Sequence, residues 1–206
     1  MVISMKHRWG KFLIYAGALA LLISAGIIAY NIWEETRAAD SAALVTQIMF
    51  EQIEDHKGNH DSGIEPLSAG SADDSENTPL YIEINGEKYI GILSIPALSL
   101  ELPVNNSLCD NRLKETPCRY AGGINDSLVI AAHNYRNHFG SLANLVEGDL
   151  VTITDAAGVD HPYIVEKVVT MSATAIDVML DDSYELTLFT CNYSGRARVA
   201  VRCAKQ

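Results

Sequence analysis

The sequence predicts an all-β domain that follows an N-terminal membrane-spanning helix. The first sign is a long apolar run near the N-terminus, and the second is a stretch before residue 80 that is rich in Gly, Ser, Asp and Asn. The third is the region after residue 80, where short alternating apolar segments are separated by turns, with no long helical pattern between them. A chain of 206 residues has room for one domain and an appendage.

The apolar run predicts a membrane anchor. Residues 12–30 carry no charged side chain, and such a run approaches the roughly 20 residues that cross a bilayer. Basic residues lie within residues 1–11, whereas Glu34 and Glu35 follow the run, so the N-terminal tail is expected in the cytoplasm and the C-terminal part outside. We therefore expect a single-pass anchor over 12–33. A cleaved signal peptide is the alternative, although its apolar core is usually shorter, about 7–15 residues.

Three further segments follow the anchor. Residues 34–56 contain few helix breakers and predict a helical stalk. Residues 57–79 are rich in small polar residues and contain two prolines, which predicts a flexible linker. In the domain over 80–206, Asn85-Gly86 between alternating segments is a hairpin signal.

Short strand-like segments make up the domain over 80–206, and they predict a small closed barrel or a sandwich. The segments after the hairpin are SIPALSLELPV, SLVIAAH, DLVTITD, YIVEKVVTM, ELTLFTC and RVAVRC. All 26 Asp and Glu residues but only 12 of the 15 Lys and Arg residues follow the anchor. Such an acidic balance argues against a nucleic-acid partner, which would need a basic face.

The four cysteines differ in their sequence surroundings. Cys109 and Cys118 flank a short loop, and the sequence leaves open whether a disulfide joins them. Cys203 lies in an apolar alternating segment, as a small buried side chain would. Cys191 ends a strand-like run and polar residues follow it, which makes it the candidate nucleophile. We expect neither a metal site nor a cofactor, because no C-x-x-C spacing occurs and the H-x-x-x-H spacing of His56 and His60 falls in the stalk and linker.

A cysteine nucleophile needs a histidine and a group that stabilises an oxyanion. His133 closes the segment SLVIAAH, so a rigid strand delivers it to the rim of a barrel, whereas His138 lies in the loop beyond. Either ring could be a surface residue, but the position at a strand end favours His133.

Four segments of the domain resemble sortases. TLFTC resembles the family's Thr-Leu-x-Thr-Cys signature, and VIAAHNYRNHFGSLANL resembles its histidine segment. RVAVRC resembles the final strand, which begins with an essential arginine, and SIPALSLELPV resembles an early strand. The resemblance covers roughly residues 80–206 in family order, and the N-terminal anchor matches as well.

The resemblance implies a closed eight-stranded β-barrel transpeptidase outside the membrane of a Gram-positive bacterium. It implies that Cys191 is the nucleophile, that His133 is the acid/base that protonates the leaving amine, and that Arg198 binds the oxyanion or the substrate backbone. Further substrate-binding candidates are Thr190, Asn134 and Tyr193. If residues 192–197 form the connection between two antiparallel strands, Arg198 lies opposite Cys191, and Arg196 falls within the loop.

The implied substrates are secreted proteins with a C-terminal Leu-Pro-x-Thr-Gly-like sorting signal. The acyl group would pass through a thioester to an amine of a peptidoglycan precursor or a pilin lysine. The short segment before Glu185 argues against class B, but the subclass, the sorting motif, the acceptor and any calcium dependence stay open. Two other functions compete: an extracytoplasmic cysteine peptidase that uses water, and a non-catalytic membrane-anchored binding barrel.

Overall fold

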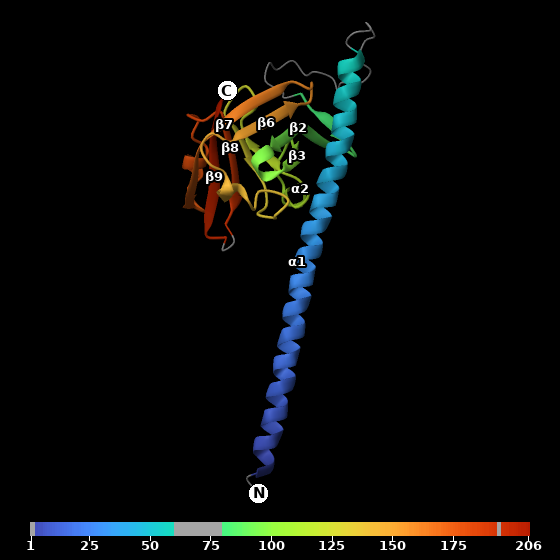
Figure 1. Ribbon diagram of the computed structural model, residues 1–206, viewed down its shortest axis with the longest axis vertical. Helices are drawn as coiled ribbons and strands as arrows, with labels where there is room; N and C mark the ends of the chain where they lie inside the picture. The colour runs from blue at the N-terminus through green and yellow to red at the C-terminus, as the bar shows by residue number, and fades with distance from the viewer. Residues whose placement is uncertain (1–2, 60–79, 193–194) are drawn as a thin grey trace. The chain divides into compact units, whose positions relative to one another are not determined.

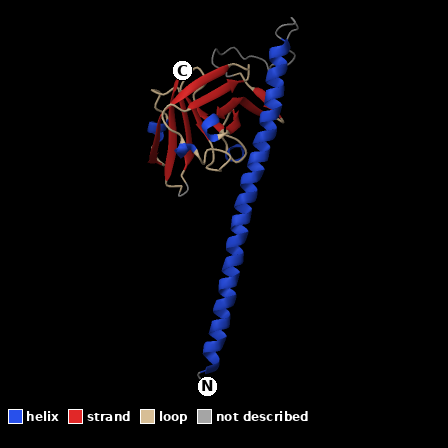
Figure 2. Ribbon diagram, in the orientation of Figure 1, coloured by secondary structure: helices blue, strands red, loops and turns tan. Residues whose placement is uncertain are grey.

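The computed structural model describes residues 3–59, 80–192 and 195–206. The chain forms two compact units, one up to Arg37 and one over Ala38–Gln206. Helix α1 (Ile3–Asn59) contributes to both units, and the second unit is otherwise built of strands joined by loops and short helices (Figure 2).

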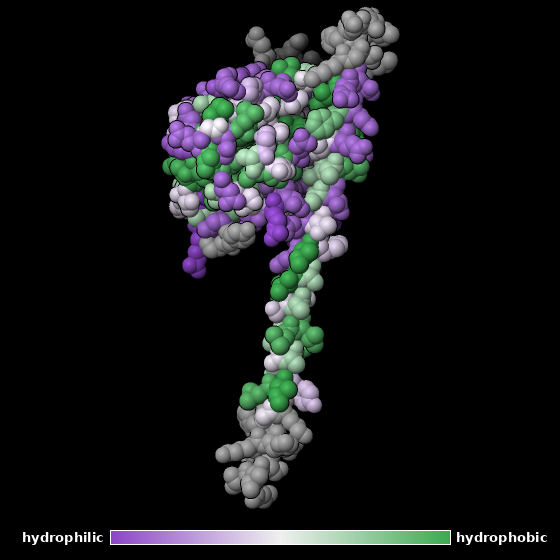
Figure 3. Space-filling view, in the orientation of Figure 1, coloured by the Kyte–Doolittle hydropathy of each residue, from purple (hydrophilic) through white to green (hydrophobic). Residues whose placement is uncertain are grey.

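The N-terminal unit is the apolar part of α1. Its large apolar side chains are exposed from Phe12 to Trp33, and Figure 3 shows them as a predominantly apolar surface along this part of the helix. Among the described residues, one helix, over Phe12–Asp55, is long and apolar enough to cross a membrane. None of its most apolar window is buried, as an anchor requires.

The described residues of the second unit form nine strands and several short helices, arranged as Figure 1 shows. The strands are β1 (Ile82–Ile84), β2 (Glu87–Ile95), β3 (Leu100–Asn105), β4 (Cys118–Ala121), β5 (Leu128–Ala131), β6 (Leu150–Asp155), β7 (Asp160–Ser172), β8 (Leu186–Cys191) and β9 (Ala197–Lys205). The short helices are α2 (Asp110–Leu113), α3 (Ile176–Met179) and the 3-10 helices η1 (Pro96–Leu98) and η2 (Leu142–Asn144).

Eight of these strands form a closed barrel, as predicted. They follow the order β2-β3-β4-β5-β8-β9-β7-β6, and pairing between β6 and β2 closes the ring. The pairs β3–β4 and β5–β8 are parallel, and the other pairs are antiparallel. Strand β1 adds to the beginning of β2 outside the ring.

The turn between β1 and β2 is the predicted hairpin. Asn85 and Gly86 have positive φ values of 53° and 81°, as a two-residue turn with two left-handed positions requires. The stretch SIPALSLELPV, expected as one strand, is instead two strands joined by η1. Pro96 lacks the N–H that a ladder needs and begins η1, and Ser99 closes it with a φ of 53°.

The main core fills the barrel interior. Side chains alternate along each strand, so Leu186 and Leu188 of β8 point inward with Val201 and Cys203 of β9. Cys203 is fully buried, as the sequence predicts. The intervening residues of these strands lie on the outer face.

The second half of α1 packs against the barrel. Val45, Met49 and Ile53 are spaced four residues apart, which places them on one helix face. They form one buried cluster with Ile82 and other residues of the β1–β2 hairpin. Residues 34–56, the predicted stalk, are helical, and those from Ala38 onward belong to the second unit. The predicted linker over 57–79 begins within α1, and its residues 60–79 lie outside the described part of the chain.

Candidate active site

Strand pairing brings three of the predicted site residues into one row across β5, β8 and β9. Cys191 ends β8 and lies directly opposite Arg198 of β9, which confirms the predicted register. Ala131 pairs with Phe189, and the next amide, that of Ala132, donates to the carbonyl of Phe189 at 3.2 Å. Continued by two residues, this register brings His133 level with Cys191. Neighbouring strands lie about 4.8 Å apart, so the three residues are adjacent.

This rim row (His133, Cys191 and Arg198) belongs to the outer face of the sheet. Alternation places Cys191 on the same face as Phe189 and opposite to the inward-pointing Leu188. The row's three residues are half-buried at the end of their strands, where a substrate can reach them. Among the described residues, the side chain of Arg198 makes no hydrogen bond, so its donors are available to a ligand. Arg196 is exposed in the preceding turn, as expected.

An apolar floor lies next to the rim row on the same face. It consists of Val129, Ala131, Phe189 and Ala200, which are buried together with Met179 of α3. Tyr120 of β4 packs edge-on against Phe189 with ring centroids 5.3 Å apart. The floor is therefore an apolar layer next to the rim row that other side chains of the protein already cover.

The loop after His133 is tightly folded, which fixes the main chain of the histidine. The amide of Phe139 donates to the carbonyl of His133 at 3.1 Å, and Phe139 is fully buried. Gly140 approaches the loop so closely that a Cβ atom would lie 2.6 Å from the carbonyl oxygen of Asn134 and 2.7 Å from that of Tyr135. Any larger residue at position 140 would displace this loop.

His138 differs from His133 in its burial. It is completely buried, and burial together with the neighbouring His133 lowers the pKa of His138 to about 4. The ring of Tyr135 contacts both, with its centroid 5.0 Å from that of His133 and 5.6 Å from that of His138. His138 is therefore neutral at physiological pH and inaccessible to a substrate, which favours His133 as the acid/base.

The three predicted substrate-binding residues have different surroundings. The hydroxyl of Thr190 is buried and donates to the carbonyl of Ala132 at 2.8 Å, which joins β8 to the residue before His133. Asn134 follows His133 and is half-buried. Tyr193 lies outside the described residues.

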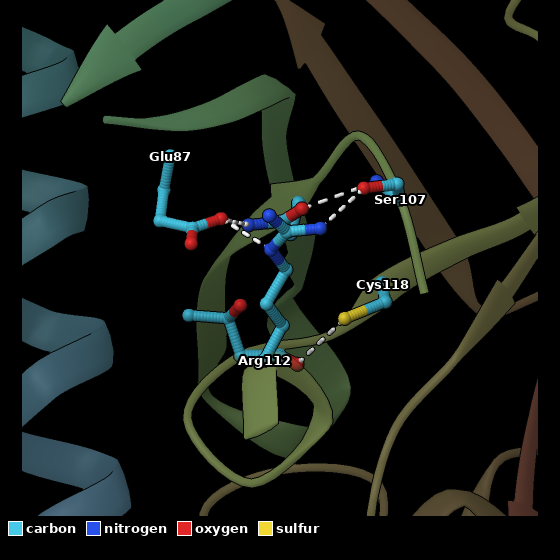
Figure 4. Close-up of polar contacts among 6 residues, drawn as sticks. Glu87, Ser107, Arg112 and Cys118 are labelled. Carbon is cyan, nitrogen blue, oxygen red and sulfur yellow. Dashed lines mark hydrogen bonds and ion pairs between the residues drawn. The ribbon is translucent and has the colours of Figure 1, made fainter. Parts of the chain in front are cut away.

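The β3–β4 connection forms one side of the face and was not predicted. Leu113 of α2 packs against the apolar floor. Figure 4 shows how the connection is fixed: Arg112 is ion-paired with Glu87 of β2, and its Nη1 donates to the hydroxyl of Ser107 at 2.7 Å. This contact joins residues far apart in sequence, and the alternating pattern gives no sign of it.

The remaining cysteines and acidic residues form neither a disulfide nor a metal site among the described residues. Cys109 is exposed at the N-terminus of α2, and Cys118 is buried with its thiol 3.5 Å from the carbonyl of Thr116 (Figure 4). Cys191 is likewise a free thiol.

Comparison with known proteins agrees with this architecture. The model of the sortase domain family matches residues 93–206. A search of curated proteins finds no match. A Clostridium perfringens sortase D5 transpeptidase is similar in structure, with a TM-score of 0.56 and 17% identity over 83% of this chain and 99% of that chain.

Two other similar structures come from different sortase classes. Streptococcus pneumoniae sortase C has a TM-score of 0.53 and 19% identity, over 77% of this chain and 88% of that chain. Listeria monocytogenes sortase A has a TM-score of 0.53 and 17% identity, over 57% of this chain and 87% of that chain. These likenesses concern the fold and leave the subclass open. The family model, which covers more than half of the chain, assigns it: this protein belongs to the sortase family.

Proposed function

We propose that this cysteine transpeptidase uses Cys191 as nucleophile, His133 as general acid/base and Arg198 as oxyanion donor, and that it acts on a Leu-Pro-x-Thr-Gly-like sorting signal. The observation that supports this assignment is the rim row, in which the thiol at the end of β8 lies opposite the guanidinium residue of β9, and the imidazole residue follows the end of the adjacent β5 by two positions. The second histidine of this region is buried and neutral, whereas His133 is half-buried at the rim.

In the first step, the thiolate of Cys191 attacks the carbonyl carbon of the Thr residue in the signal. A carbon–sulfur bond forms, and the carbonyl oxygen becomes an oxyanion. When the intermediate collapses, the Thr–Gly carbon–nitrogen bond breaks, and protonated His133 gives its proton to the leaving amine. The product is a thioester on Cys191.

In the second step, an amine attacks the thioester and releases the thiolate of Cys191. Neutral His133 takes the proton from the attacking amine, so the enzyme returns to its starting state. A peptidoglycan precursor or a pilin lysine would supply this amine, and water would give slow hydrolysis instead.

Arg198 is suited to the oxyanion because of its charge and its free donors. A guanidinium offers a planar, permanently charged set of donors, whereas Lys offers a point charge. Arg198 lies directly opposite Cys191, so it reaches the position where the oxyanion forms. Thr190 would support the site by positioning the chain before His133.

The apolar helix would hold this activity at the cell surface. We propose a single-pass anchor over residues 12–33, with the basic tail inside and the barrel outside. External protease on intact protoplasts should then cleave the chain after the anchor. Full protection of the barrel would contradict this orientation, and release of a soluble mature protein would indicate a cleaved signal peptide.

The reaction is tested by intact-mass spectrometry of the full chain in detergent micelles. The protein is incubated with a panel of Leu-Pro-x-Thr-Gly-like peptides, with and without triglycine, and Cys191→Ala is the matched control. We expect the mass of the wild type to rise by that of the acyl fragment, and added triglycine to remove this adduct and yield the joined peptide. The control should show neither.

The competing functions give different results in the same experiment. A cysteine peptidase would form the thioester and release only the hydrolysed peptide, whatever the triglycine concentration. A non-catalytic binding barrel would form no adduct with any peptide of the panel.

A further inference from the structure

Arg202 is a buried cation on the face that carries the rim row. It lies on β9 four residues after Arg198, and alternation places both on the outer face, about 13 Å apart along the strand. Only 1% of Arg202 is exposed, which is unusual for an arginine and requires that its donors be satisfied.

The guanidinium of Arg202 binds the segment that joins β7 to β8. Its Nη1 atom donates to the carbonyl of Met179 at 3.2 Å, and its Nη2 atom donates to the carbonyl of Val178. Both carbonyls lie at the end of α3, where helical carbonyls lack partners within the helix. The carbon of the guanidinium also lies 5.2 Å from the ring centroid of Tyr184, near the other end of the segment.

The same guanidinium is tied to the sheet. Its Nη1 atom donates to the hydroxyl of Thr187 at 2.7 Å, and Thr187 is the residue opposite Arg202 on β8. Arg202 thus joins two strands of the barrel to the β7–β8 segment. A second tie comes from the hydroxyl of Ser127, which donates to the carbonyls of Asp182 and Tyr184 at 3.1 and 3.0 Å.

The β7–β8 segment covers the apolar floor. Met179 is buried in the same cluster as Phe189 and Ala200, whereas Ile176, Val178 and Leu180 of this segment are exposed. A peptide that approaches Cys191 along the outer face therefore passes this segment. The position of the segment depends on main-chain carbonyls held by Arg202, because a four-residue helix has little stability of its own.

We propose that Arg202 is a positioning residue for the donor peptide: it fixes the β7–β8 segment over the apolar floor and thereby sets the affinity for the peptide without taking part in the chemistry. This role rests on the proposed function, since it assumes that the donor peptide lies along this face. The guanidinium is too deeply buried to contact the reacting carbonyl, and both of its Nη atoms already donate to oxygens of the protein.

Steady-state kinetics of the full chain in detergent micelles test this role. Arg202→Met keeps much of the stem and removes the donors, Arg202→Lys keeps the charge, and Lys167→Met is the control because Lys167 is the other cation over the Tyr184 ring, at 4.7 Å. For Arg202→Met we expect the KM for the donor peptide to rise about tenfold or more, as for a lost charged hydrogen bond. The kcat and the KM for triglycine should change little. The donor KM of Arg202→Lys should lie between those of the wild type and Arg202→Met, and the donor KM of Lys167→Met should match that of the wild type.

Hydrogen exchange supplies a second measurement that needs no peptide. The amide of Leu180 donates to the carbonyl of Ile176 at 3.0 Å, and in Arg202→Met we expect it to exchange faster while the amides of β8 and β9 stay protected. If Arg202→Met does not fold, Arg202→Lys and Thr187→Val take its place, and Thr187→Val should raise the donor KM by a smaller factor.

Two results would overturn the proposal: unchanged exchange in the β7–β8 segment, or a loss confined to kcat with an unchanged donor KM. If the wild type turns over none of the peptides, the proposed function fails, and exchange alone decides whether Arg202 holds the segment.

Discussion

Around the sheet formed by β5, β8 and β9, a histidine, a cysteine and an arginine lie at the rim, and a second residue of each type is buried nearby. His133, Cys191 and Arg198 are half-buried in the rim row. Their counterparts His138, Cys203 and Arg202 are 0%, 0% and 1% exposed. The chemical groups are the same in both sets, so their surroundings decide what each can do.

Burial acts differently on each of the three buried groups. It lowers the pKa of His138 to about 4 and raises the pKa of Cys203 to about 12, so both stay neutral. Arg202 stays charged, and its Nη1 and Nη2 atoms donate to carbonyl and hydroxyl oxygens. His138 and Cys203 are neutral and Arg202 is hydrogen-bonded within the protein, so we assign all three a structural role. We propose that the rim set carries the reactivity, and the predictions below test this contrast.

The two histidines should give the largest difference in activity. We expect His133→Ala to reduce transpeptidation about 1000-fold or more, because the leaving amine loses its proton donor. The variant should unfold at the same temperature as the wild type. Peptide turnover and thermal unfolding measured on the same sample check this.

His138→Ala is the comparison variant. It removes a buried ring beside Tyr135 and should lower the free energy of unfolding by roughly 1–3 kcal/mol. Activity per folded molecule should fall far less than in His133→Ala. Equal losses of activity in the two variants at equal folded fractions would contradict the assignment of the acid/base to His133.

The two arginines nearest Cys191 come next in size. We expect Arg198→Ala and Arg198→Lys each to lower turnover at least about 100-fold, as the loss of an oxyanion donor does. Arg196→Ala should cost much less, because Arg196 lies exposed in the turn. Turnover at saturating peptide decides between them, with circular dichroism as the check on folding. A larger loss at Arg196 would mean that the hairpin register does not set the oxyanion site.

The buried histidine also predicts how stability depends on pH. The pKa of His138 is about 4 in the folded chain, whereas an ordinary histidine, as in the unfolded chain, has a pKa of 6.5. Between pH 4 and pH 6.5 the unfolded state therefore binds more protons than the folded state. The contribution of His138 to the free energy of unfolding is therefore fully present above pH 6.5, and it is lost as the pH is lowered toward 4. Relative to His138→Phe, we expect the wild type to lose about 2–3 kcal/mol between pH 7 and pH 4.5.

Denaturant unfolding of both proteins at the two pH values measures this difference. The comparison cancels the carboxylates that titrate in the same range, since both proteins contain them. His138→Asn serves if the larger Phe ring does not fit. Parallel loss in the wild type and in the variant would show that His138 does not stay neutral in the folded chain.

The sequence predicts the barrel and the rim row for a physical reason. Alternation fixes which face a residue occupies, and a connection of fixed length fixes which residues lie opposite each other, so the pairing of Cys191 with Arg198 is accessible from sequence. Tertiary contacts between separate segments cannot be predicted from these patterns. The four-residue elements β4 and α3 are too short to show a period, and the ion pair of Arg112 with Glu87 joins separate segments.

Two further features illustrate this limit. The face of Val45, Met49 and Ile53 on α1 has a readable helical spacing, but its partner, the β1–β2 hairpin, could not be identified from that pattern. Arg202 in an apolar strand is visible in the sequence as an outward-facing residue. The sequence does not show that the β7–β8 segment folds over Arg202 and buries its guanidinium.

The cysteines give the prediction with the smallest effect on activity. Burial raises the pKa of both Cys118 and Cys203 from about 9 to about 12, which lowers their thiolate fraction at neutral pH about 1000-fold. Iodoacetamide reacts with the thiolate, so we expect two adducts on the folded protein, at Cys109 and Cys191, and four after denaturation. Cys109→Ser should leave turnover unchanged, whereas alkylation of Cys191 should abolish it.

Two adducts after denaturation, instead of four, would indicate a Cys109–Cys118 disulfide, which would close only a short loop and stabilise the fold by about 3 kcal/mol or less. Such a disulfide would change stability and leave the rim thiol free, whereas a disulfide at Cys191 in active protein would contradict the proposed mechanism.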